Sequence, residues 1–146
     1  MRTQTWMLML GFLVLLGCSK PDTIPPEPLA TLANTYWKLT ELDGMPVVMD
    51  PGQERESFFQ IQEGPGTVRG FSGCNRFSGA YRLDGHILSL GPLAVTRKAC
   101  IVAMEMERKF LEVLEETATF AIAGENLTLF DAQSRPTGRF IAVYFD

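Results

Sequence analysis

The chain has 146 residues, which is enough for one domain with a core of its own. It carries 13 basic and 17 acidic residues, and its formal net charge is −4. Proteins that bind nucleic acid usually have the opposite balance and a basic stripe, so we expect no nucleic-acid partner.

The first 17 residues have the features of a bacterial export signal. Arg2 is their one basic residue, no residue among them is acidic, and residues 6–16 are almost wholly apolar. A run of about 11 apolar residues matches the apolar region of a signal peptide and is too short to cross a bilayer. Residues 15–18, Leu-Leu-Gly-Cys, resemble the bacterial lipobox, in which the peptide bond before the cysteine is cut and the thiol is lipidated. We therefore expect residues 1–17 to be a lipoprotein signal peptide and Cys18 to be the site of lipid attachment. The alternative is an ordinary secretory signal with an incidental cysteine.

If Cys18 carries lipid, we expect the protein to be attached to a membrane of the bacterial cell envelope. Two or three acyl chains make a stable membrane anchor, whereas a single chain binds only marginally. Ser19 stands where an aspartate would favour retention in the inner membrane of enteric bacteria. We therefore expect attachment to the outer membrane of the bacterial cell envelope, facing the periplasm. Loss of Arg2 with the signal leaves 12 basic and 17 acidic residues, a formal net charge of −5.

Residues 18–31 have the composition of a tether. Prolines among scattered polar residues stiffen a segment toward polyproline II without building a core. The prolines are Pro21, Pro25, Pro26 and Pro28. At about 3.1 Å per residue, such a segment lifts a domain roughly 30 Å from the membrane. The folded domain is therefore expected over residues 32–146.

Short strands open this domain. The segment 36–42 alternates and is rich in aromatic residues, which predicts a strand, and Asp43-Gly44 predicts a turn after it. The same pattern predicts further strands over residues 57–62, 67–71, 77–83 and 86–90. Turn residues separate them, and Asp84-Gly85 predicts a two-residue hairpin.

One helix is predicted over residues 101–117. Apolar residues recur at spacings of three and four, which places them on one helix face. They are Ala103, Met106, Phe110, Val113, Leu114 and Thr117. The glutamates of this segment, Glu107 among them, are expected to form a solvated face. Strands follow at residues 120–123, 127–130 and 138–144. Strands around a single helix predict an α+β fold with a mostly antiparallel, curved sheet packed on that helix.

Two cysteines remain once Cys18 is assigned to lipid. In an oxidising compartment, Cys74 and Cys100 most simply form a disulfide. Closing a loop of 26 residues is worth about 3 kcal/mol in the chain-entropy model. A nucleophilic cysteine would need a base, and His86, the one histidine, falls in a predicted strand next to a turn. A single histidine also speaks against the usual His-rich zinc sites, so we expect no metal and no cofactor.

Two spaced blocks resemble a known family. Residues 73–81, Gly-Cys-Asn-Arg-Phe-Ser-Gly-Ala-Tyr, are similar to the Gly-Cys-Asn-Arg…Gly-x-Tyr signature of META domains, the family of HslJ-like bacterial proteins. Residues 96–100, Thr-Arg-Lys-Ala-Cys, match a second block that precedes the helix. The likeness covers roughly residues 32–144, and Lys98 departs from it, since an apolar residue is common there. The matched motif residues are Gly73, Asn75, Arg76, Gly79, Tyr81, Thr96 and Arg97.

The resemblance implies a half-barrel packed on a helix and no accepted catalytic mechanism, so we expect a non-enzymatic protein. Family members are associated with the heat-shock response, with resistance to novobiocin and, in a parasite relative, with motility and virulence. We therefore expect a role in stress or antibiotic tolerance through binding an envelope protein partner or an apolar ligand. The alternatives are a pilotin-like assembly accessory for an outer-membrane complex and an uncharacterised enzyme. A pilotin-like groove would lie between sheet and helix, a purely structural accessory would have a flat polar surface, and an enzyme would have a concave site with strongly shifted pKa values.

The motif residues also have chemistry of their own. Gly73 and Gly79 are expected to supply backbone freedom for a tight turn or bulge. Asn75 tolerates left-handed geometry and can bond its own backbone. Tyr81 is expected to pack its ring and leave its hydroxyl at a polar edge, and Thr96 to bond backbone before the helix.

Arg76 and Arg97 are candidate ligand-binding residues. Two cations near the predicted disulfide could hold a carboxylate or another anionic ligand. The alternative, which we weigh more heavily, is that both arginines form ion pairs with acidic residues on the surface.

Overall fold

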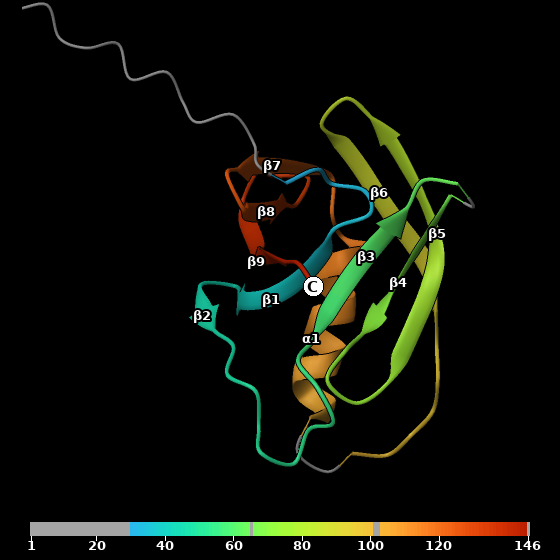
Figure 1. Ribbon diagram of the computed structural model, residues 1–146, viewed down its shortest axis with the longest axis vertical. Helices are drawn as coiled ribbons and strands as arrows, with labels where there is room; N and C mark the ends of the chain where they lie inside the picture. The colour runs from blue at the N-terminus through green and yellow to red at the C-terminus, as the bar shows by residue number, and fades with distance from the viewer. Residues whose placement is uncertain (1–29, 65, 101–102, 146) are drawn as a thin grey trace, which may run out of the picture.

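A computed structural model of the protein describes residues 30–64, 66–100 and 103–145. The predicted signal peptide, Cys18 and most of the predicted tether lie outside the described residues. Within these residues the strands are β1 (Tyr36–Leu42), β2 (Met45–Pro46), β3 (Phe58–Gln62), β4 (Thr67–Phe71), β5 (Arg76–Asp84), β6 (Ile87–Val95), β7 (Thr119–Ala123), β8 (Asn126–Phe130) and β9 (Pro136–Val143), and the helix is α1 (Met104–Glu115). All paired strands are antiparallel, and the curved sheet packs against α1, which confirms the predicted fold class (Figure 1).

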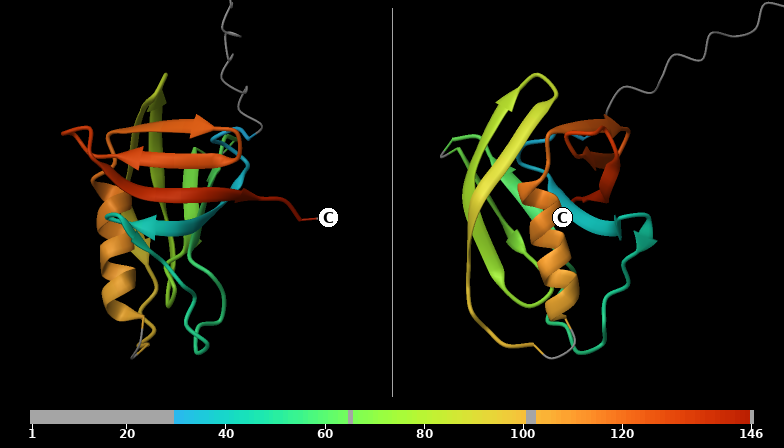
Figure 2. Two further views of the ribbon diagram at one scale, coloured as in Figure 1. Left: turned by 90° about the vertical axis from the view of Figure 1, so that its left-hand side faces the viewer. Right: turned by 180° about the vertical axis from the view of Figure 1, so that it is seen from behind.

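The sheet curls into a ring, because β1 pairs with β3 on one side and with β9 on the other. The order around the ring is β1-β3-β4-β5-β6-β7-β8-β9, and β2 extends β1 alone. The narrowest connection is between β6 and β7, which share the single residue pair Ile87 and Thr119. Figure 2 shows that β7, β8 and β9 run at a steep angle to β3, β4 and β5. The ring therefore has two halves. The sheet was predicted as a half-barrel, and the pairing of β1 with β9 closes it into a ring.

The core lies inside this ring. Alternation in the strands turns side chains such as Trp37 and Phe59 inward, where both are fully buried. Phe110 of α1 enters from the side, and its ring lies 5.9 Å from that of Phe77 and 6.0 Å from that of Phe140. Burying one such side chain stabilises the fold by about 1.5–3 kcal/mol. The helix therefore packs against one side of the ring and closes the core there.

The helix is shorter than predicted, but its inward face is the predicted one. It begins at Met104 and ends at Glu115, whereas residues 101–117 were expected, and residues 101–102 lie outside the described part. Of the predicted face, Met106 is partly buried, and the fully packed members are Ala103, Phe110, Val113, Leu114 and Thr117. Thr117 lies just past the helix, where its hydroxyl donates to the carbonyl of Val113 at 2.7 Å.

The predicted strand at 86–90 is wrong at its C-terminal end, since β6 continues to Val95. Glycine and proline usually interrupt a strand, yet Gly91 and Pro92 lie within β6. They form a bulge in β6, where the two residues lie opposite Ala80 of β5 and the register shifts between Gly79 and Tyr81. The bulge accommodates a residue without an N–H group and lets pairing resume beyond it.

No helix in the described residues is long and apolar enough to cross a membrane.

Candidate functional site

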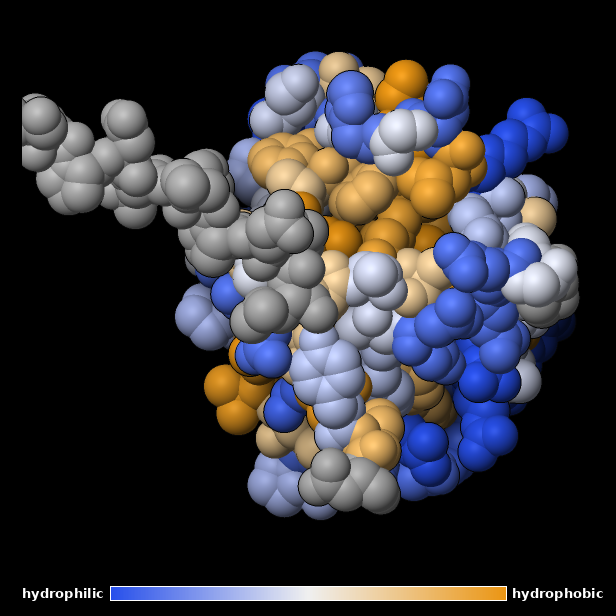
Figure 3. All heavy atoms as spheres, turned by 45° about the horizontal axis from the view of Figure 1, so that its top comes forward, coloured by the Kyte–Doolittle hydropathy of each residue, from blue (hydrophilic) through white to orange (hydrophobic). Residues whose placement is uncertain are grey.

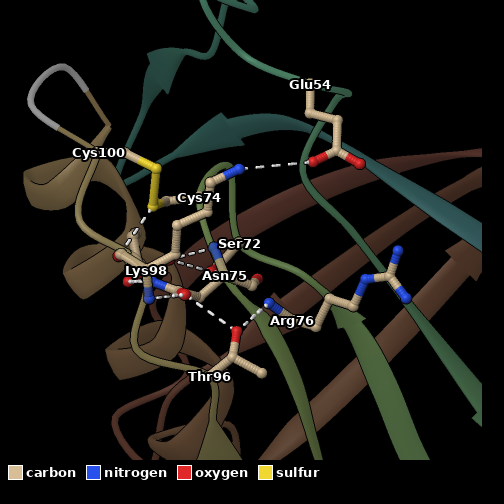
Figure 4. Close-up of a disulfide and its surroundings, with 9 residues drawn as sticks. Glu54, Ser72, Cys74, Asn75, Arg76, Thr96, Lys98 and Cys100 are labelled. Atoms are coloured by element: carbon tan, nitrogen blue, oxygen red, sulfur yellow. Dashed lines mark hydrogen bonds and ion pairs between the residues drawn. A yellow bond between two sulfur atoms is a disulfide. The ribbon is translucent and has the colours of Figure 1, made fainter.

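The two motif blocks meet at the start of the helix. Cys74, in the connection between β4 and β5, forms a disulfide with Cys100, and their Cα atoms are 5.8 Å apart (Figure 4). This bond ties the β4–β5 connection to residues 96–100, which lead into α1. Neither cysteine is a free thiol, so no cysteine nucleophile is present in the described residues. His86 lies in the exposed β5–β6 turn and not in a strand.

Asn75 is the centre of the hydrogen bonds around this disulfide. Its side chain is buried, and its Oδ1 accepts the Lys98 N–H at 2.7 Å and the Thr96 hydroxyl at 2.9 Å. Its Nδ2 donates to the Lys98 carbonyl at 3.0 Å and to Glu107 Oε1 at 2.9 Å. An amide side chain offers two donor hydrogens and two acceptor lone pairs, and all four are used here. Asn75 therefore joins its own connection, the second motif block and the helix.

Glu107 completes this network from α1. Its Oε2 accepts the backbone N–H of Asn75 at 2.8 Å and also the hydroxyl of the fully buried Ser72. The expectation that Glu107 belongs to a solvated helix face is therefore wrong. Sequence reasoning missed Ser72 as well, because nothing in the chain order indicates that residues 72 and 107 meet.

The structure corrects the expectation for Asn75 and adds a side-chain partner for Thr96. The backbone of Asn75 is not in the left-handed region, and its side chain bonds to other segments and not to its own turn. Thr96 bonds the side chain of Asn75, and its Oγ1 also accepts the backbone N–H of Arg76 at 3.1 Å. The motif residues Asn75 and Thr96 therefore hold distant segments of the chain together and do not form a local turn.

The glycines behave largely as expected. Gly73 has φ +95° and packs against the side chains of Met106 and Gln53, so it supplies the predicted backbone freedom. Gly79 of β5 lies beside the bulge in β6, and a Cβ atom there would lie 2.6 Å from the carbonyl oxygen of Pro92. Tyr81 lies just beyond the bulge and packs half-buried against the core.

The structure does not bring Arg76 and Arg97 together. The side chain of Arg76 points away from the disulfide, toward the outer face of the sheet (Figure 4). Arg97 lines a different hollow, beside Val95 and Met104. Within the described residues neither arginine has an ion pair, so the surface pairs that we weighed more heavily are not formed there. Lys98, where the chain departs from the family pattern, is exposed and lies 3.8 Å from Glu54.

An apolar groove lies between the β1–β2 end of the sheet and α1. It has a volume of about 400 Å³ and is lined by Leu42, Met45, Pro46, Val47, Val48, Glu105, Met106 and Lys109. Val48 is 85% exposed and Met45 is 60% exposed. The charged residues come from the helix, where Lys109 and Glu105 lie 3.9 Å apart. A groove between sheet and helix is the feature expected of a pilotin-like protein.

Apolar side chains are also exposed elsewhere. Figure 3 shows them gathered across the upper part of the molecule, with hydrophilic side chains along its right-hand side. Leu83 and Ile87, in the hairpin of β5 and β6, are 46% and 54% exposed. This hairpin reaches the top of the molecule in Figure 1, away from the groove. Because Leu83 pairs with Leu88, Leu83 and Ile87 lie on opposite faces of this hairpin. Each is a single exposed apolar side chain away from the groove, against which the groove can be compared.

The described residues contain no cluster of three or more histidine, cysteine, aspartate or glutamate side chains that could hold a metal ion.

Burial and the neighbouring Glu56 carboxylate raise the pKa of the Tyr36 hydroxyl, which donates to Glu56 at 3.1 Å. This tyrosine is a hydrogen-bond donor at neutral pH and not a base.

Comparison with known proteins agrees with the motifs. The META domain family matches residues 30–143. The chain is 31% identical over 127 residues to "Heat shock protein HslJ" of Escherichia coli (strain K12), a match covering 86% of each chain. A protein from Burkholderia xenovorans solved by NMR has a TM-score of 0.61 and 25% identity, covering 87% of this chain and 99% of that one. A DUF4847 family protein from Bacteroides vulgatus ATCC 8482 shares the fold, with a TM-score of 0.55, 14% identity and coverage of 79% and 96%.

The motif blocks therefore lie together in space, and the family match spans nearly all of the described residues. The chain belongs to the META domain family.

Proposed function

We propose that this protein is a non-enzymatic, lipid-anchored module of the bacterial cell envelope that binds a protein partner through the groove between β2 and α1. The groove is the observation that supports the proposal, because it is an open apolar surface. The motif residues Asn75 and Thr96, in contrast, already form hydrogen bonds within the domain. The similarity to a heat shock protein supports a role in stress tolerance. The proposal extends to novobiocin tolerance, which the resemblance of the motif blocks implies.

The groove suits an amphipathic helix of the partner. Met45 and Met106 give it flexible, polarisable walls, which adapt to apolar side chains of different shapes. Glu105 and Lys109 border it with one charge of each sign, which can pair with the polar face of such a helix. Helices that dock in this way insert apolar side chains from one face into the groove.

The proposed anchor is tested by mass spectrometry of the membrane-extracted protein. Loss of residues 1–17 and acyl mass on Cys18 are the expected result, since the lipobox-like segment ends at this cysteine. A thiol-alkylating label should react at Cys74 and Cys100 only after reduction, because the two form a disulfide. An unacylated chain would contradict the anchor, and free labelling of Cys74 and Cys100 would contradict the disulfide.

The proposed groove is tested by photocrosslinking in cells. A photoreactive residue at Val48 is expected to give a crosslinked envelope protein, because this position is 85% exposed at the groove. The matched position is Ile87, which is also apolar and exposed but lies outside the groove. Met45→Glu is expected to abolish the Val48 product, since a charge placed in an apolar contact loses favourable hydration. The same variant should lower survival under heat or novobiocin toward that of a strain lacking the protein.

The outcomes of this experiment separate the candidates. A product from Ile87 but not from Val48 would contradict the groove as the binding surface. An outer-membrane channel subunit as the captured protein would make the protein a pilotin-like accessory, which the position of the groove between sheet and helix also favours.

A further inference from the structure

A second cavity opens on the outer face of the sheet, where β1, β3, β4 and β5 lie next to one another. It has a volume of about 350 Å³, within the range of small-molecule sites. Its walls are aromatic: Tyr36 stacks on Phe58, with ring centroids 4.0 Å apart and planes 17° apart, and Phe71 adds a third ring. Such walls favour a flat apolar or aromatic group.

Three arginines border this cavity, and no acidic residue lines it. The Arg76 side chain has no ion pair or hydrogen bond within the described residues, and its backbone N–H is held by Thr96. Arg69 donates to the neutral amide oxygen of Gln60 at 3.1 Å. Arg55 lies over the Phe71 ring at 5.9 Å. Positive charge is thus concentrated at one place on a protein whose formal net charge is −4.

The glutamates near this cavity are already engaged. The Glu54 carboxylate lies 3.8 Å from Arg55 and 3.8 Å from Lys98, so it forms ion pairs with both side chains. Glu56 accepts the hydroxyl of Tyr36. Neither side chain reaches Arg69 or Arg76, so two guanidinium groups remain available for an added anion.

Sheet register explains how these side chains come together. Phe58 pairs with Phe71, and Phe71 in turn pairs with Arg76, so the three form one row across β3, β4 and β5. The pair of Gln60 and Arg69 forms the next outward-facing row. The helix lies on the other side of this sheet, so the cavity is separate from both the core and the partner groove (Figure 1).

We propose that this cavity binds a small molecule that combines an aromatic ring with an anionic group, such as an aromatic carboxylate. The ring packs among Tyr36, Phe58 and Phe71, and the carboxylate accepts hydrogen bonds from Arg76 and Arg69. Guanidinium groups suit this role because their planar donors match a carboxylate in two-point geometry. This binding goes beyond the proposed partner groove and does not depend on it.

The test uses a matched pair of probes, 2-naphthoate and its neutral amide 2-naphthamide, which have nearly the same shape and differ in charge. Each is titrated by calorimetry into the purified full-length protein in detergent, with empty micelles subtracted. Naphthoate is expected to bind with a dissociation constant of roughly 1 mM, the range for a ligand of this size. The dissociation constant of naphthamide is expected to be about fivefold higher, because naphthamide lacks the charge-assisted hydrogen bonds.

Two arginine variants complete the test. Arg76→Gln is expected to weaken naphthoate binding about threefold, because Arg69 remains, and to leave naphthamide unchanged. Arg82→Gln is the matched control, because Arg82 is exposed on the same strand and makes the same charge change outside the cavity. Equal binding of the two probes would overturn the proposal, as would equal effects of the two variants. The Arg76→Gln protein is expected to keep the crosslinked product from Val48, because Arg76 lies outside the groove. The crosslink therefore tests the groove independently of the cavity.

Discussion

Replacing Gly70 by alanine is expected to lower the free energy of unfolding by roughly 4 kcal/mol or more, a large part of the about 5–15 kcal/mol that is typical of a folded domain. Gly70 lies in β4, paired with Phe59 of β3. An added methyl group would collide with the backbone carbonyl oxygen of Phe58 and lie 2.5 Å from Cζ of Phe77. A flexible side chain could move aside, but the backbone of the neighbouring strand cannot do so without losing its pairing with β4.

Urea denaturation followed by circular dichroism measures this effect. The matched control is Gly64→Ala, because a Cβ atom at Gly64 would have no neighbour within 4 Å. The control is expected to change stability by less than about 1 kcal/mol. Similar midpoints for the two variants would show that the close approach of β3 to Gly70 is not the cause.

Replacing Asn75 by alanine is expected to lower the free energy of unfolding by roughly 3 kcal/mol, because a buried hydrogen-bond network loses its central member. Four hydrogen bonds of the amide disappear at once. The N–H and carbonyl of Lys98 and the carboxylate of Glu107 lose partners in a partly buried place. Unmet hydrogen-bonding groups of this kind cost more than the lost bonds themselves contribute.

Thermal and urea unfolding are again the measurements, with Asn126→Ala as the matched control. Asn126 is exposed at the start of β8, so its replacement is expected to change stability by less than about 0.5 kcal/mol. Asn75→Asp provides a second test, because it keeps the acceptors but places a carboxylate against Glu107. It should also destabilise the protein near neutral pH. A stable Asn75→Ala protein would mean that the disulfide alone holds these segments together.

Much of the fold could be predicted from the sequence, because the deciding signals are local. Alternation defined β1 and β3, and apolar spacing defined the inward face of α1 around Phe110 and Leu114. The short strand β2 was missed, since two residues carry no periodicity. The C-terminal half of β6 was missed because pairing resumes beyond the bulge at Gly91 and Pro92 only through contacts with β5, which the pattern of one strand does not show.

The site was less predictable, because it depends on contacts between distant segments. The motifs indicated that Asn75 and Thr96 matter, but spacing along the chain could not show that both bond to each other and that Asn75 bonds to Glu107. The outer cavity needs the register that sets Phe71 beside both Phe58 and Arg76. A one-residue slip would turn these side chains inward, so a single strand's pattern could not reveal the cavity.

Closure of the ring also bears on self-association. Strands at the margin of an open sheet present unpaired N–H and C=O groups, which can template the addition of another chain and lead to aggregation. Here β1 has neighbours on both sides, and the strand at the margin of the sheet order is β2, with two residues. One of these is Pro46, which has no N–H group to offer. A partner at the groove would therefore be held by side chains, and a copy of the domain could not extend the sheet by adding a strand beside β2.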